Sequence, residues 1–189
     1  MLNPWINVKK LSRVIGVCGS AFDRFRHERE TLLFALVRMD GRLEGVSRIS
    51  IETDGTDSTS AISDEVLNRY CERANYVMLP GITFGGLNLC DIAEINAATG
   101  LPVLSIVRHR PDLDSIKHAV MKRTPDPQKR IAILERTGIF ALFINNSYMI
   151  YANLAGIDAA EAELLLRKST LFGKMPEPLR IARMISGIV

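Results

Sequence analysis

Residues 76–92 read YVMLPGITFGGLNLCDI, and this stretch says most about the fold. A short apolar run ends at Pro80-Gly81, and a loop that contains Gly85 and Gly86 follows it. The pattern predicts a buried strand, a tight glycine turn and the start of a helix. In open α/β folds, ligands bind where the strands end at their carboxyl edge. The stretch therefore predicts where a functional site lies.

The totals describe an ordinary globular protein. The chain has 189 residues, of which 47% are hydrophobic and 24% are charged. This composition and length suit one domain over residues 1–189, and no repeat or low-complexity linker divides the chain. The formal net charge of +3 is too small to identify a nucleic-acid-binding protein by itself.

Three cysteines, Cys18, Cys71 and Cys90, have no close C-x-x-C spacing, and their number is odd. This argues against a disulfide framework and a structural zinc site, and it favours small buried side chains. No apolar run approaches the roughly 20 residues that span a bilayer, and the first residues lack the apolar core of a signal peptide. We therefore expect a soluble, cytoplasmic protein with no membrane partner.

Three β-patterned runs come first and predict an antiparallel meander. Residues 13–18 are compact and β-branched, and residues 32–39 form a second apolar run. Asp40-Gly41 is a hairpin turn signal. Residues 43–52 then alternate between apolar and polar, as a strand with one solvated face does.

Helices and strands alternate after residue 52. Residues 139–144 and 148–154 fit either a late hairpin or buried helix, and both interpretations stay open. The other expected elements are a helix around 62–70, a strand over 76–79, a helix over 87–98, a strand over 101–107, a helix opened by 111–114, and helices over 125–136, 158–168 and 179–188.

This order of elements is that of the ribonuclease H-like fold, an α/β fold with a mixed sheet flanked by helices. A three-stranded antiparallel meander is extended in it by parallel strands. The first, third, fourth and fifth strands then run the same way, so their carboxyl ends share one edge of the sheet. This edge carries Cys18, Glu52, Asp54, Asp57, Pro80 with its glycine loop, and Arg108-His109-Arg110.

Three carboxylates, Glu52, Asp54 and Asp57, follow the third strand. They can hold Mg²⁺ or Mn²⁺ together with an outside ligand such as phosphate, and Glu52 and Asp54 are then the catalytic candidates. The alternative, which we favour, is that Asp54-Gly55 forms a turn and Asp57 caps the following helix. Asp91 faces either the edge or the positive end of its own helix.

The glycine loop is a candidate anion site. Backbone N–H groups of Gly81, Gly85 and Gly86 at a helix start favour an anion such as phosphate, with Thr83 and Asn88 as side-chain donors. The loop is not a Walker loop, because no G-K-[ST] follows it. The simpler alternative is that the glycines only allow tight packing between strand and helix.

Residues 108–130 contain seven Lys and Arg residues against three Asp residues. This local excess predicts contact with a phosphate backbone, with Arg108, His109 and Arg110 nearest the edge, although a solvated helix face also explains it. Cys18 is a candidate nucleophile only if His109 acts as its base. An inert, half-buried thiol is the simpler interpretation.

Six segments together resemble the archaeal family called domain of unknown function 99, across nearly the whole chain. The glycine run GITFGGLNLCDI and the run PEPLRIA are the most specific of them. The resemblance implies a fold related to endonuclease V, which is itself ribonuclease H-like. The segments are residues 13–17, 54–59, 81–92, 100–103, 110–116 and 176–182.

Endonuclease V enzymes hold divalent metal with carboxylates at strand ends beside a phosphodiester. The resemblance implies one carboxylate at the end of the first strand, one after the third, and one opening the glycine loop. This chain has Cys18-Gly19, Glu52 and Pro80 at those places. A thiol is a poor Mg²⁺ ligand, and proline offers only its carbonyl. The resemblance therefore predicts a degenerate metal site.

From these observations we expect binding of DNA, RNA or a nucleotide phosphate at the carboxyl edge. Two alternatives stay open. One is an active metal-dependent nuclease that uses a rearranged site of Glu52, Asp54, Asp57 and Asp91. The other is a non-catalytic module that binds a protein. The sequence carries no signal for an oligomeric state.

Overall fold

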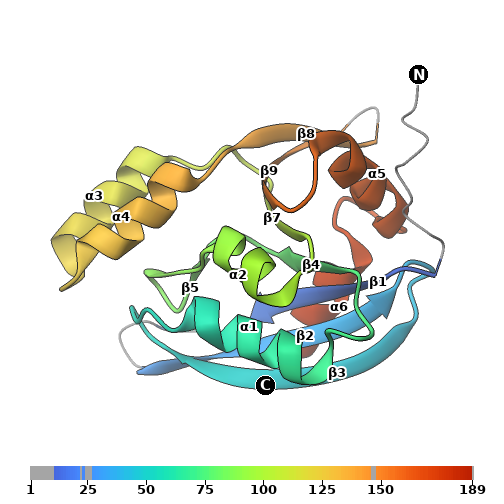
Figure 1. Cartoon of the computed structure of the whole chain (residues 1–189), viewed down its shortest axis with the longest axis horizontal. Coiled ribbons are helices and arrows are strands. Elements are labelled where there is room, and N and C mark those ends of the chain that lie inside the picture. Colours follow the sequence, from blue (N-terminus) through green and yellow to red (C-terminus); the bar gives the residue numbers. More distant parts are fainter. Residues whose placement is uncertain (1–10, 22, 24–26, 146–147, 189) are drawn as a thin grey trace.

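A computed structural model describes residues 11–21, 23, 27–145 and 148–188. Its centre is a seven-stranded mixed sheet in the order β3-β2-β1-β4-β7-β9-β8 (Figure 1). The predicted meander and parallel strands are all present in this sheet. The strands are β1 (Arg13–Gly19), β2 (Arg29–Arg38), β3 (Leu43–Glu52), β4 (Tyr76–Leu79), β7 (Val103–Val107), β8 (Phe140–Asn145) and β9 (Tyr148–Ala155).

Strand direction follows the prediction. β2 is antiparallel to both β1 and β3, while β1, β4 and β7 are parallel to one another. All four residues of β4 are buried, as expected for a central parallel strand covered on both faces. β3 alternates between exposed and less exposed residues, because it is the outer strand of the meander.

Helices cover both faces of the sheet (Figure 1). α1 (Ser58–Arg69) and α2 (Ile92–Thr99) pack on one face, and α5 (Ala159–Ser169) and α6 (Glu177–Ser186) pack on the other. Side chains alternate along β4: Val77 and Leu79 enter the core with α1 and α2, whereas Tyr76 and Met78 enter the core with α5 and α6. The result is a three-layer sandwich.

Gly16 in β1 allows α6 to lie directly against the sheet. A Cβ atom at position 16 would be 2.1 Å from the backbone oxygen of Pro178 in the first turn of α6. The helix therefore runs close beside β1 and β2, with which it makes most of its contacts. This close approach places its last turns near the end of β1, where Cys18 lies.

The glycine stretch differs from the prediction. Residues 87–98 do not form one helix, because β5 (Thr83–Phe84) and β6 (Asn88–Leu89) pair as a small hairpin and α2 begins only at Ile92. Left-handed backbone at Gly85 and Gly86, with φ of +47° and +83°, makes the turn of this hairpin.

The open question about residues 139–154 is settled as a hairpin, β8 with β9. Residues 146–147 at its turn lie outside the described residues. Buried side chains alternate along both strands, and they pack under α5: Leu142, Ile144, Ile150 and Ala152. β9 pairs antiparallel with β7, so the hairpin extends the sheet beyond the predicted strands.

α3 (Leu113–Arg123) and α4 (Pro127–Arg136) form a helical hairpin that projects from the body of the protein (Figure 1). Its inner side packs on the β5–β6 hairpin through Val120 and Leu134. Among the residues that the structure describes, no helix combines the length and the apolar character needed to cross a membrane.

Candidate functional site

The carboxyl edge of the sheet gathers the predicted site residues. The parallel strands β1, β3, β4 and β7 end there, at Gly19, Glu52, Leu79 and Val107. β2 runs the opposite way, so its first residues also lie at this edge and bring Glu30 to it. Glu30 was not among the site residues predicted from the sequence.

The three carboxylates after β3 are turned to different partners. Asp57 accepts hydrogen bonds from the backbone N–H of Glu52 at 3.2 Å and from Asn88 Nδ2 at 2.6 Å. Asp54 Oδ1 accepts one from the backbone N–H of Leu87 at 2.7 Å. The Glu52 side chain is 62% exposed. Asp54 and Asp57 therefore accept hydrogen bonds from within the fold, whereas the Glu52 carboxylate lies exposed, 3.9 Å from Arg29.

This geometry departs from the predicted metal and catalytic set of Glu52, Asp54 and Asp57. Within the described part of the chain, no three His, Cys, Asp or Glu side chains are arranged to hold a metal ion. The alternative prediction was a turn at Asp54-Gly55 and a helix cap by Asp57. The turn is confirmed, because the Gly55 N–H donates to the Glu52 carbonyl at 3.2 Å. The predicted cap is wrong, because Asp57 occupies the N-cap position of α1 but its side chain accepts no capping hydrogen bond.

Asn88 caps α1 instead and is a structural residue. It is fully buried, and its Oδ1 accepts from the backbone N–H of Ser58 at 3.1 Å. Its Nδ2 donates to Asp57 Oδ1 at 2.6 Å and to the Glu52 carbonyl at 2.9 Å. The amide is saturated within the fold, so the prediction of Asn88 as a donor to an outside anion is not supported.

The glycine loop donates backbone hydrogen bonds to two carboxylates of the chain itself, those of Glu30 and Asp54. The backbone N–H of Gly85 donates to the Glu30 carboxylate, and that of Leu87 donates to Asp54. Gly86 leaves room for this second carboxylate, because a Cβ atom there would be 2.4 Å from Asp54 Oδ1. The loop thus holds two carboxylates of the same chain. This corrects the prediction of an open phosphate site at Gly85 and Gly86.

Asp91 faces the positive end of its helix. It is the N-cap of α2, and its Oδ1 accepts from the backbone N–H groups of Ala93 at 3.0 Å and Glu94 at 3.3 Å. Its Oδ2 forms an ion pair with Arg136 Nη2 at 2.6 Å. The helix start that was expected to bind an outside anion is therefore already filled by Asp91.

Glu30 occupies the space beside the end of β1. A Cβ atom at Gly19 would lie 1.9 Å from Glu30 Oε1, so glycine at position 19 makes room for this carboxylate. Glu30 is 8% exposed. Burial raises its pKa above the ordinary value, and the hydrogen bond from Gly85 opposes the rise only in part. A buried carboxylate with a raised pKa costs stability when it is ionised.

We therefore predict that Glu30→Gln does not destabilise the protein at pH 7–8 and raises its melting temperature there. The glutamine keeps an acceptor for Gly85 and removes the buried charge. Because the raised pKa lets the folded state bind a proton first, the parent gains stability as pH falls through that pKa. The advantage of the variant should shrink toward pH 4.5, while Glu28→Gln, at an exposed position, serves as control. A variant less stable than the parent at pH 8 would contradict this.

Cys18 is half-buried at the end of β1, next to Ser186 and Arg183 of α6. Burial raises the pKa of the thiol, and the Ser186 hydrogen bond and the Arg183 charge only partly oppose that effect. A thiol held in its protonated form is a poor nucleophile. The environment therefore favours the inert thiol over the nucleophile.

Two adjoining hollows run between the strand ends and α6, and we call them the α6 groove. Their volumes are about 210 Å³ and 470 Å³. The charged side chains that line them are Arg108, Lys174 and Arg183, and no acidic residue is among the described lining residues. Pro80 lies where the two hollows meet. The position at which the resemblance implies a carboxylate thus borders both hollows of a basic groove.

The other basic residues of segment 108–130 differ in their surroundings, some exposed and one buried. His109 and Arg110 are exposed and line neither hollow of the α6 groove, so their predicted contact with phosphate stays a prediction. Arg130 is 3% exposed and donates to the backbone carbonyls of Leu87 at 2.9 Å and Gly55 at 2.8 Å. It is a structural clamp, which corrects its place in a phosphate-binding segment.

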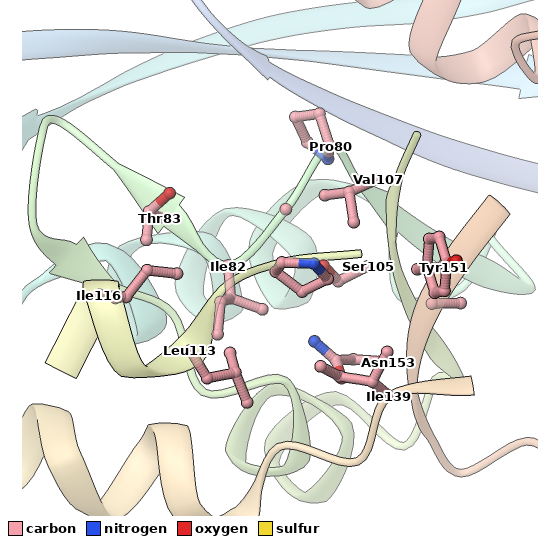
Figure 2. Close-up of a pocket in the computed structure, with 13 residues that line it drawn as sticks. Pro80, Ile82, Thr83, Ser105, Val107, Leu113, Ile116, Ile139, Tyr151 and Asn153 are labelled. Atoms are coloured by element: carbon pink, nitrogen blue, oxygen red, sulfur yellow. The ribbon is translucent and has the colours of Figure 1, made fainter. Parts of the chain in front are cut away.

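A smaller cavity lies on the other side of Pro80 (Figure 2). Gly81 and Thr83, both predicted as binding residues, line it. Its volume is about 110 Å³, and most of its walls are apolar. The cavity adjoins the α6 groove, because Pro80 and Val107 border both.

Comparison with known proteins agrees with this architecture. Residues 10–189 match the protein family described as endonuclease dU. The chain belongs to the endonuclease dU family. One relative is the UPF0215 protein of Thermoplasma volcanium, which is 37% identical over 94% of this chain and 89% of the relative. The finer resemblance to domain of unknown function 99 stays a prediction.

Solved structures show the same fold for this endonuclease dU family member. A protein of unknown function from Archaeoglobus fulgidus is similar with a TM-score of 0.81 and 31% identity, over 93% of this chain and 96% of that one. Endonuclease V from Ciona intestinalis, in complex with inosine-containing DNA, has a TM-score of 0.60 at 10% identity, over 95% and 86%. The chain therefore has an endonuclease V-like, ribonuclease H-like fold.

The divalent metal that an endonuclease V-like fold implies does not fit the residues of this chain. Cys18 and Pro80 stand where the resemblance implies two oxygen ligands, and the Glu30 carboxylate beside the end of β1 accepts a hydrogen bond from Gly85. Hard cations such as Mg²⁺ need several oxygen ligands around one point. The described residues of this edge therefore do not form a site for such a cation.

Proposed function

We propose that this protein binds nucleic acid at the carboxyl edge of its sheet, with phosphates in the α6 groove. The observation that supports this most is the charge of that groove, whose charged lining residues Arg108, Lys174 and Arg183 are all basic. Basic side chains along a groove are the electrostatic signature of phosphate binding. The complex of the Ciona intestinalis endonuclease V with DNA makes a nucleic-acid partner a natural choice for this fold.

The groove does not need a metal to attract phosphate. In an acidic site, a cation must neutralise the carboxylates before a phosphodiester can approach. Cys18 and Pro80 carry no charge, so this repulsion is reduced at the two strand ends that they occupy. Two like unit charges about 4 Å apart near a protein surface repel by roughly 4 kcal/mol. Losing such carboxylates changes the edge from a metal site into a direct phosphate site.

Fluorescence anisotropy with labelled single- and double-stranded DNA and RNA tests this proposal. We expect binding at 50 mM salt that weakens as salt rises, with a slope of log K against log salt of about −2 to −3 for three phosphate contacts. Binding that is undetectable at low salt, or that does not change with salt, would reject the proposal.

We further propose that the edge binds without cutting. Incubation of deaminated, nicked and RNA-containing substrates with the protein in Mg²⁺ or Mn²⁺ is expected to give no products above an EDTA control. The reason is that no three His, Cys, Asp or Glu side chains of the described residues are arranged to hold the cation. Asp54→Ala is the control for trace activity. Cleavage by the parent that disappears in Asp54→Ala would instead support a rearranged nuclease site.

A further inference from the structure

The α3–α4 hairpin is fixed to the carboxyl edge of the sheet at two places. α3 begins beside the end of β7, where Leu113 and Ile116 line the cavity next to Pro80. Nearer the turn between the two helices, Arg130 of α4 donates to the carbonyl of Gly55, in the turn after β3. The hairpin therefore follows the edge from the end of β7 toward the end of β3.

The free end of the hairpin is basic. Figure 1 shows the turn between α3 and α4 at this end. Toward the other end, Lys117 pairs with Glu135 at 3.5 Å, and Arg136 pairs with Asp91 at 2.6 Å. Three exposed cations near the turn form no ion pair with another residue that the structure describes, and we call them the α3 tip: Lys122, Arg123 and Lys129.

Helix dipoles explain only part of this charge. Lys122 and Arg123 lie in the last turn of α3, where the negative end of the helix stabilises cations. Lys129 lies in the first turn of α4, where the positive end disfavours a cation. That turn contains no acidic residue, and Asp126 at the N-cap position forms no capping bond. Stabilisation of the helices therefore does not account for all three cations.

We propose that the α3 tip binds the phosphate backbone of a double-stranded segment that adjoins the strand in the α6 groove. The inference rests on the proposed function, because the groove holds the neighbouring part of the same nucleic acid. α3 has 11 residues and is therefore about 16 Å long. This length corresponds to roughly five base pairs at about 3.4 Å each. The tip thus extends the contact by about half a turn of duplex.

A duplex suits this surface better than an unpaired strand does. The cations stand on two helices that are packed together through the buried Val120 and Leu134, so their spacing is fixed. Phosphates of a duplex also have a fixed spacing, whereas a single strand loses conformational freedom when it adopts one. Residues 113–136 contain no Phe, Tyr or Trp, so the hairpin offers no stacking surface for unpaired bases.

Fluorescence anisotropy with two kinds of DNA tests the inference. A single strand of about 12 nucleotides is compared with the same strand joined, on its 5′ or its 3′ side, to a duplex of about ten base pairs. We expect at least one joined DNA to bind about tenfold tighter than the single strand at 50 mM salt. Its slope of log K against log salt should also be steeper by about two to three units.

Charge reversal at the tip should remove this gain alone. Lys122→Glu/Arg123→Glu is expected to bind the joined DNA no more tightly than the single strand, and to keep its affinity for the single strand within about threefold. Arg69→Glu/Arg167→Glu makes the same change in net charge at exposed positions of α1 and α5, and it should keep the gain. Retention of the gain by the tip variant, or its loss by both variants, would overturn the inference.

A neutral variant guards against a disturbed helix. Glutamates in the last turn of α3 oppose the helix dipole, whereas Lys122→Gln/Arg123→Gln adds no negative charge. This variant should keep the melting temperature of the parent within about 2 °C and still lose most of the gain. A neutral variant that is folded and keeps the full gain would contradict contact by the tip.

The same measurements separate this inference from the proposed function. Equal affinity of the parent for the single strand and both joined DNAs would overturn the inference and leave the proposed function intact. If Arg108→Glu/Arg183→Glu binds joined DNA as tightly as the parent while the tip variant does not, the groove fails and the tip stands. Absence of binding to every DNA would overturn both.

Discussion

Reversing the charge of Arg108 and Arg183 together is expected to lower the affinity for single-stranded DNA at least tenfold at 50 mM salt. Arg108 lines one hollow of the α6 groove, and Arg183 lines both. Each phosphate contact that is lost should also reduce the slope of log K against log salt by about one unit. Arg108→Glu/Arg183→Glu should therefore have a slope smaller by about two, measured by anisotropy over a salt series.

The matched control makes the same change in net charge elsewhere. Arg69 at the end of α1 and Arg167 near the end of α5 are both exposed and line none of the hollows at the edge. Arg69→Glu/Arg167→Glu should change affinity by less than about threefold, because distant charges are screened in salt. Equal losses in the two double variants would mean that net charge, and not the groove, attracts the nucleic acid.

Replacing Arg130 by methionine is expected to lower the free energy of unfolding by about 3 kcal/mol. The buried guanidinium donates to backbone carbonyls from three separate segments, those of Asp54 and Gly55, of Leu87 and of Asp126. Methionine fills much of the volume but leaves these oxygens without their donor. The loss corresponds to a fall in melting temperature of roughly 6–12 °C for a domain of this size.

Hydrogen exchange shows where this clamp acts. Arg130 joins α4 to the turn after β3 and to the β5–β6 hairpin, so Arg130→Met should expose amides of α3 and α4 before those of the central sheet. Lys129→Met, one residue away and exposed, is the matched control and should change stability by less than about 0.5 kcal/mol. If the two variants have the same stability, Arg130 is not the anchor of the helical hairpin.

The sheet was predictable because its signals are local. The alternation in residues 43–52 and the wholly apolar run 76–79 each specify a strand and its degree of burial. The order of these elements then fixes the parallel strands and the edge that they share. The late hairpin could not be chosen over a helix, because its alternation becomes informative only once α5 covers one face of β8.

The site was less predictable because it depends on contacts between distant residues. Glu30 reaches Gly85 across 55 positions, and Asn88 caps a helix that begins 30 positions earlier. Nothing local in the sequence marks either pair. Gly19 gives a weak signal, since a glycine at a strand end leaves space that another side chain can occupy.

Asn153 of β9 lines the cavity beside Pro80, and it was not predicted from the sequence for the same reason. It lies in a run that reads as ordinary apolar strand, and only the pairing of β9 with β7 places it beside Ser105 at the cavity. Pro80, by contrast, was found from the sequence because it interrupts an apolar run just before the glycines. The structure adds that this proline separates a basic groove from an apolar cavity.

Photo-cross-linking tests most directly whether nucleic acid lies at this edge. Single-stranded DNA with one 5-iododeoxyuridine is irradiated with the unmodified protein, and the joined residues are identified by mass spectrometry. Cross-links to Tyr151 in the cavity or to Met175 in the α6 groove are the predicted result. Cross-links confined to α1 or to the outer strand β3 would contradict binding at the carboxyl edge.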